Sequence, residues 1–196
     1  GITTISFPER GSVMIIGITG PNGSGKSTVA KAMADQWGFV YLSAREYLTE
    51  ELNMANVEVT RMAMNELANQ IRTAEGPIAL FERMLVKAGN HANIVIESVR
   101  CPGEVDLLIQ KGGILIGVDA PRQLRYERAI LRGSSTDKIS IEQFVREEEL
   151  EATSTDPNKQ NISTCMQRAE ISIKNDSDNL ERLQSKIIIL GQRLGL

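Results

Sequence analysis

Short apolar runs alternate with longer stretches of helical periodicity along this chain. The first run, residues 13–18, is continuous and leads into a segment rich in glycine with one proline, which is typical of a strand covered on both faces. Similar runs predict further strands at residues 39–42, 94–96, 114–118 and 171–173. Because parallel strands need crossover connections, the alternation predicts an α/β fold, with a five-stranded parallel sheet and helices on both faces.

The stretches between these strands carry the start signals of helices. Thr60 is a good N-cap, and Pro77 fits a first helical turn. Helices are expected at residues 28–37, 44–53, 61–73, 77–87, 103–110, 122–132, 140–152 and 180–194. Three of them form one long excursion before the third strand. A polar break at residues 133–138 separates two others in the layout of a lid, and the apolar stripe of the last helix is expected to pack on the sheet.

Length, composition and charge limit the classes of protein to consider. A chain of 196 residues, 41 % hydrophobic and 24 % charged, is typical of one globular domain, expected at residues 13–196 after an extension at 1–12. The net charge of −3 disfavours nucleic-acid binding. No apolar run approaches the roughly 20 residues of a membrane span. Cys101 and Cys165 are expected to be reduced thiols, and His91 is expected to be an exposed turn residue. The protein is expected to be cytoplasmic and to be a monomer or a homodimer.

Residues 20–27, Gly-Pro-Asn-Gly-Ser-Gly-Lys-Ser, match the phosphate-binding loop (Walker A) pattern in full, after a strand and at the start of a helix. The glycines let backbone N–H groups point at phosphate oxygens, and the helix N-terminus adds partial positive charge. Lys26 is suited to neutralise the β- and γ-phosphates, and the Ser27 hydroxyl to ligate Mg²⁺, so ATP and Mg²⁺ are the expected cofactors. The expected nucleotide-binding residues are Gly20, Asn22, Gly23, Ser24, Gly25, Lys26, Ser27 and Thr28, with Asn175 at the end of the last strand.

Two charged residues follow the third strand, at the sheet edge where ligands bind in folds of this kind. Glu97 is suited to hold Mg²⁺ through its water shell, and the alternative is a pair with a nearby cation. Arg100 is suited to clamp the phosphate of an acceptor, and the alternative is a surface ion pair. Together they favour transfer between two phosphorylated ligands.

Charge also clusters on the two helices beside the expected lid. Arg125, Arg128 and Arg132 are three and four residues apart and share one face, which is either a phosphate-binding face or a solvated one. The carboxylates at residues 147–149 and Glu151 are expected to form a face that is solvated or paired with lysine.

With these motifs, residues 13–192 resemble the nucleoside-monophosphate kinases, in particular the small P-loop kinases that are similar to adenylate kinase or dephospho-coenzyme-A kinase. The resemblance implies a three-layer α/β/α fold with strand order 2-3-1-4-5, a helical acceptor-binding region at about 44–90 and a lid at about 133–160. It also implies that Arg128 and Arg132 face the donor nucleotide and that Arg100 contacts the acceptor phosphate. Residues 43–48 do not match the Thr-Gly-Asp motif of adenylate kinases, so Arg45 and Arg72 are the candidates for a second acceptor-binding arginine.

The sequence thus favours an enzyme that transfers a phosphoryl group from ATP to a nucleoside or deoxynucleoside monophosphate, with Lys26, Arg100, Arg128 and Arg132 as its catalytic side chains. The partners are two small molecules. Two alternatives stay open: a nucleotide-binding regulatory module without efficient transfer, and an activity like that of dephospho-coenzyme-A kinase. An ATPase coupled to conformational work is weaker, because no clear Walker B aspartate is visible.

Overall fold

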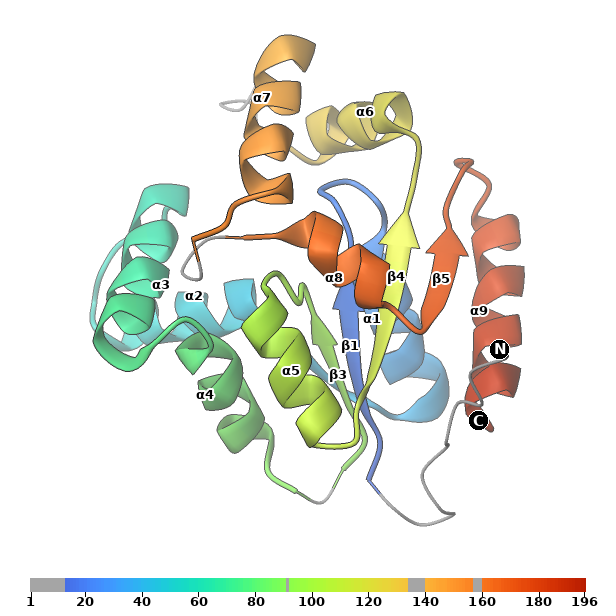
Figure 1. Ribbon diagram of the computed structural model, residues 1–196, viewed down its shortest axis with the longest axis horizontal. Helices are drawn as coiled ribbons and strands as arrows, with labels where there is room; N and C mark the ends of the chain where they lie inside the picture. Colours follow the sequence, from blue (N-terminus) through green and yellow to red (C-terminus); the bar gives the residue numbers. More distant parts are fainter. Residues whose placement is uncertain (1–12, 91, 134–139, 157–159) are drawn as a thin grey trace.

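A computed structural model describes residues 13–90, 92–133, 140–156 and 160–196, so the N-terminal extension, His91 and nearly all of the expected lid loop lie outside the described residues. The five strands are β1 (Ile15–Thr19), β2 (Val40–Ser43), β3 (Ile94–Glu97), β4 (Ile114–Asp119) and β5 (Ile171–Lys174). They form one parallel sheet in the order β2-β3-β1-β4-β5, which confirms the expected topology (Figure 1).

One face of the sheet is covered by α1 (Lys26–Trp37) and α9 (Leu180–Leu194), which lie behind and to the right of the strands in Figure 1. The apolar stripe of α9 packs as expected, because Leu183, Ile187 and Leu190 are buried in one cluster with Ile16 of β1.

The other face is covered by α4 (Ala79–Ala88), α5 (Pro102–Gln110) and α8 (Ile162–Arg168), whose apolar side chains share a second cluster with β3 and β4. These two packed faces confirm the three-layer arrangement. The helices α2 (Ala44–Met54) and α3 (Arg61–Glu75) extend to one side of α4, and α6 (Arg122–Arg132) and α7 (Ile141–Ala152) stand beyond the carboxyl ends of the strands (Figure 1). None of the described helices is long and apolar enough to cross a membrane.

Two predicted helix starts differ from the structure, and one short helix was not predicted. The first helix begins at Lys26 and not at residue 28, so Lys26 and Ser27 themselves lie in its first turn. The fourth helix begins at Ala79, two residues after Pro77. The short helix α8 was not predicted, although Asn161 caps it by accepting a hydrogen bond from the backbone N–H of Thr164 at 3.1 Å.

Candidate functional site

The loop between β1 and α1 closes so tightly that its glycines admit no side chain. Gly20, Gly23 and Gly25 all have positive φ angles. A Cβ atom on Gly23 would lie 2.4 Å from the backbone oxygen of Arg125, and one on Gly25 would lie 2.4 Å from the amide nitrogen of Asn175. The loop is therefore pressed against both α6 and the end of β5, and only glycine fits at these positions.

Hydrogen bonds within the loop, and one from the residue after β5, hold the loop in a compact conformation. Lys26 Nζ donates to the carbonyl oxygens of Gly20 and Pro21, at 2.8 and 2.9 Å. The side-chain amide of Asn175, which is buried, donates to the carbonyl of Ser24 at 2.9 Å. The Ser24 hydroxyl is also buried and has no hydrogen-bond partner among the described residues. Because its side chain faces inward, Ser24 can reach a phosphate only through its backbone, whose N–H donates to Pro21 here at 3.2 Å.

A cavity of about 420 Å³ lies on one side of the loop, between α6 and the start of α9. Its polar lining comes from three separate parts of the chain: the loop with the first turns of α1, the arginines of α6, and the segment after β5. It contains seven of the residues that the sequence singles out for the donor nucleotide: Gly23, Gly25, Ser27, Thr28, Arg128, Arg132 and Asn175.

We call this space the donor-side cavity, after the role expected for its residues. Arg128 joins its walls. Its guanidinium donates to the Asp178 carboxylate at 3.2 Å and to the backbone oxygen of Ser177 at 2.9 Å, and it lies 3.4 Å from the carbonyl of Gly23. Arg132, one turn further on, is exposed. Of the two arginines, Arg128 therefore also has a structural role, because it links α6 to the phosphate-binding loop and to the segment after β5.

A second cavity, of about 590 Å³, lies on the other side of the loop, between α2, α3 and the segment after β3. It brings together the three arginines considered for the acceptor, Arg45, Arg72 and Arg100, with Lys26. Residues far apart in sequence thus meet as four positive charges around one space. No carboxylate is among the described residues that line it.

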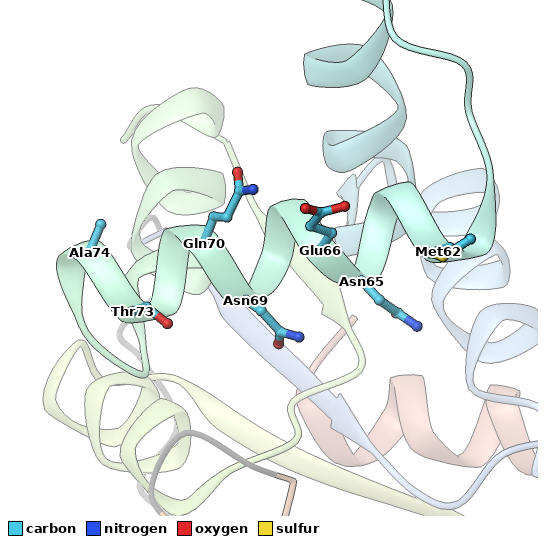
Figure 2. A pocket seen from close by; sticks show the side chains of 7 residues that line it. All are labelled: Met62, Asn65, Glu66, Asn69, Gln70, Thr73 and Ala74. Carbon is cyan, nitrogen blue, oxygen red and sulfur yellow. The ribbon is translucent and has the colours of Figure 1, made fainter.

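We call this second space the acceptor-side cavity, after the role expected for its three arginines. Two amide side chains of α3 also line it and were not anticipated from the sequence. Asn65 and Asn69 are one turn apart and also border an open groove on the outer face of α3. Figure 2 shows both projecting from the same side of the helix, opposite Glu66 and Gln70. Their spacing of four residues is the only signal in the sequence that places them together, and many solvated helices share it.

Glu97 lies at the carboxyl end of β3, in register with Ile18 of β1 and Ser43 of β2. Its carboxylate accepts a hydrogen bond from the hydroxyl of Tyr41. Burial and this carboxylate raise the pKa of Tyr41 well above its ordinary value, so the phenol stays a donor. The partner of Glu97 is therefore a tyrosine and not one of the described cations.

The oxygen donors near the loop suit a hard cation. The Ser27 hydroxyl and the Glu97 carboxylate are ligand types that Mg²⁺ prefers. The described part of the chain holds no group of three or more His, Cys, Asp or Glu side chains that would bind a metal by itself. This sparse donor set fits a magnesium ion that keeps several waters and is also held by nucleotide phosphates.

One prediction on α7 is wrong. Glu148 does not belong to a solvated face: its side chain is only 18 % exposed, and it pairs with Arg125 at 2.6 Å and with Arg122 at 3.3 Å. Arg125 is turned inward, and its guanidinium also donates to the carbonyl of Ala120 at 2.8 Å. The buried Arg125 and the exposed Arg122 therefore draw one of the α7 carboxylates out of the solvent.

Comparison with known proteins finds relatives that match most of the chain. The chain is 27 % identical over 177 residues to a UPF0200 protein of Pyrobaculum aerophilum, covering 89 % of this chain and 95 % of the relative. It is 28 % identical over 140 residues to a cytidylate kinase of Ignicoccus hospitalis, covering 70 % and 75 % of the two chains.

The fold has relatives among solved structures. A shikimate kinase from Bacteroides thetaiotaomicron superposes with a TM-score of 0.61 at 15 % identity, covering 94 % of this chain and 99 % of that one. The profile of the family described as "AAA domain" matches residues 16–154, which is more than half of the chain. The chain therefore belongs to the AAA domain family and has the architecture of the P-loop kinases.

Proposed function

We propose that the protein transfers the γ-phosphoryl group of ATP to the phosphate of a nucleoside or deoxynucleoside monophosphate. The observation that carries this proposal is the acceptor-side cavity, where Arg45, Arg72 and Arg100 share one space with Lys26 of the phosphate-binding loop. Arginine forks match the geometry of phosphate oxygens, and three of them exceed what a neutral acceptor needs.

The chemistry of the cavity favours a phosphate acceptor over a hydroxyl acceptor. A hydroxyl group becomes a good nucleophile when a positioned base takes its proton, and the described lining of this cavity offers no carboxylate for that task. A monophosphate is already anionic and needs no such base. The amides of Asn65 and Asn69, which can both donate and accept hydrogen bonds, suit the polar edge of a nucleobase.

In this proposal the donor binds on the opposite side of the loop. Backbone N–H groups of the loop and Lys26 hold the β- and γ-phosphates, and Arg128 and Arg132 face the donor across its cavity. Ser27 and Glu97 hold Mg²⁺, which neutralises phosphate charge when it is bound. Catalysis then consists of positioning two anions and neutralising their charge, so no protein nucleophile is required.

A panel of acceptors tests the proposal. The purified chain is mixed with ATP, Mg²⁺ and one acceptor at a time, and ADP release is followed with coupling enzymes. The acceptors are the common ribo- and deoxyribonucleoside monophosphates, with dephospho-coenzyme A, shikimate and gluconate as comparisons. We expect turnover with at least one monophosphate and none with dephospho-coenzyme A, shikimate or gluconate, which accept on a hydroxyl group.

Three outcomes would contradict it. ATP binding without turnover on any acceptor would favour the regulatory module. ADP release that does not depend on an acceptor would favour an ATPase. Turnover with dephospho-coenzyme A, shikimate or gluconate alone would show that the cavity serves a hydroxyl group.

A further inference from the structure

A buried carboxylate that the proposed reaction does not use lies beneath the segment that carries Arg100. Glu104, in the first turn of α5, is only 6 % exposed. Its Oε2 atom accepts a hydrogen bond from the backbone N–H of Arg100 at 2.9 Å. A glutamate at the third position of a helix more often reaches back to the N-cap residue, which is Cys101 here. In this chain the bond goes one residue further, to Arg100 itself.

The same segment is held at other points. The backbone oxygen of Arg100 accepts from the N–H of Asn161 at 2.8 Å, and the Thr19 hydroxyl donates to the carbonyl of Val99 at 2.7 Å. Ser98 takes a left-handed conformation, with φ of 68°. This is a costly backbone for a residue other than glycine, so the surrounding bonds must maintain it. The segment is thus built to hold one conformation, and Glu104 supplies its only bond to a charged side chain among the described contacts.

Charge links Glu104 to the acceptor-side cavity as well. Arg72 of α3 and Arg100 both attract its carboxylate electrostatically. Both also line the cavity, where Arg100 Nη1 donates to Gln160 at 3.0 Å. A carboxylate is costly to bury unless it offsets other charges. Arg72 and Arg100 are such charges, because both line the acceptor-side cavity before an anion binds there.

From these contacts we propose that Glu104 is a positioning residue of the acceptor site. Its carboxylate fixes the backbone from which Arg100 projects and offsets the repulsion between Arg72 and Arg100 before an acceptor phosphate arrives. The inference deepens the proposed function and rests on it, because it takes the acceptor to be a phosphate.

Two variants separate the bond from the charge. Glu104→Ala removes both, whereas Glu104→Gln keeps an oxygen that can accept from the Arg100 N–H. Glu170→Ala is the matched control: Glu170 also accepts from a backbone N–H, that of Leu115 at 2.6 Å, but it lies outside the cavity lining. Each variant is titrated by calorimetry with cytidine and adenosine monophosphates and, separately, with ADP. Its melting temperature is measured in parallel.

We expect Glu104→Ala to weaken monophosphate binding about 10-fold or more, the scale of a charge-assisted hydrogen bond, with ADP binding changed less than about 2-fold. Glu104→Gln is expected to fold and to lose about 3-fold. Glu170→Ala is expected to leave both affinities unchanged. Equal losses for ADP and the monophosphates, or equal losses in the Glu170 variant, would overturn the inference.

A second readout keeps this inference separate from the proposed function. The Nε–H resonance of Arg100 reports its position without any ligand, and it is expected to shift or broaden in Glu104→Ala. An unchanged resonance would overturn the positioning role. If the wild-type chain binds no monophosphate while the resonance shifts as expected, the proposed function fails and Glu104 still positions Arg100.

Discussion

Arg125 of α6 and Glu148 of α7 form an ion pair of 2.6 Å that is largely removed from solvent. Because Arg125 also lies 3.5 Å from the carbonyl of Asn22, the pair connects α7 to the phosphate-binding loop. The ring of Phe144 adds a second link, since it packs edge-on against Tyr126 of α6 at 5.6 Å. The helix α7, which belongs to the expected lid, is therefore docked on α6.

Removing the acidic partner of this pair should loosen α7. Glu148→Gln leaves the charge of Arg125 without its counter-ion in a desolvated position, so we expect a loss of about 2 kcal/mol in the free energy of unfolding. Hydrogen exchange should quicken across residues 141–152. The control is Glu149→Gln, which changes an exposed neighbour on the same helix. If the two variants have the same stability and exchange, the pair does not hold α7.

Lys26→Ala is expected to abolish turnover while the fold persists. The side chain bonds to two carbonyls of its own loop and lies in no apolar cluster, so its loss falls mainly on phosphate binding. The turnover number should fall by at least about 10²–10³-fold, as for other groups that stabilise transition-state charge. Steady-state assays and melting curves check this. A much lower melting temperature without ligand would reveal a structural role for the lysine.

Arg100→Ala should harm the acceptor side of the reaction alone. The loss of one guanidinium facing the phosphate is expected to raise the acceptor KM, or to lower kcat, by about 10- to 100-fold. Donor affinity should stay nearly constant, because Arg100 lines the acceptor-side cavity and belongs neither to the phosphate-binding loop nor to the donor-side cavity. Arg83→Ala, which breaks an exposed pair with Glu75, is the matched control. Equal damage to ATP binding in the Arg100 variant would move this residue to the donor site.

The pH dependence of stability should carry the mark of Glu104. Burial raises its pKa above the ordinary value of 4.5, although Arg100 and Arg72 oppose the shift. The buried thiols of Cys101 and Cys165 also face it, and burial raises their pKa values to about 12, so they stay neutral. The native state therefore binds the proton of Glu104 more tightly than the unfolded chain does. Stability is lost as the pH rises from about 4.5 through the native pKa.

Glu104→Gln removes this loss. We expect the variant to melt above the wild type at about pH 8, and the gap to close as the pH falls towards about 4.5. Thermal melts across this range measure the gap. A gap that is independent of pH would mean that ionisation of Glu104 does not cost stability.

The sheet was predictable because its strands are short apolar runs separated by turn residues, and because the phosphate-binding loop marks where the first strand ends. The lining of the acceptor-side cavity was partly predictable. Arg100 lies three residues after the strand β3, whereas Arg45 and Arg72 were identified by resemblance, and the structure brings all three to one space.

The missed features depend on packing that a single sequence does not display. The helix α8 has about two turns, which is too short for a clear period. Nothing local distinguishes Glu148 from the carboxylates beside it, since only the arginines of α6 decide which one faces inward. The position of Glu104 beneath Arg100 follows from the backbone path after β3, and that path includes an unusual left-handed serine.

Phosphorus NMR of a single reaction mixture tests the central claim most directly. The chain is incubated with ATP, Mg²⁺ and the monophosphate that gives the highest turnover, and the products are identified by their resonances. We predict that ADP and a second nucleoside diphosphate accumulate in equal amounts, with no inorganic phosphate above the level of a Lys26→Ala control. ADP accompanied only by inorganic phosphate would contradict the claim that the arginine-lined cavity holds the phosphate that receives the transferred group.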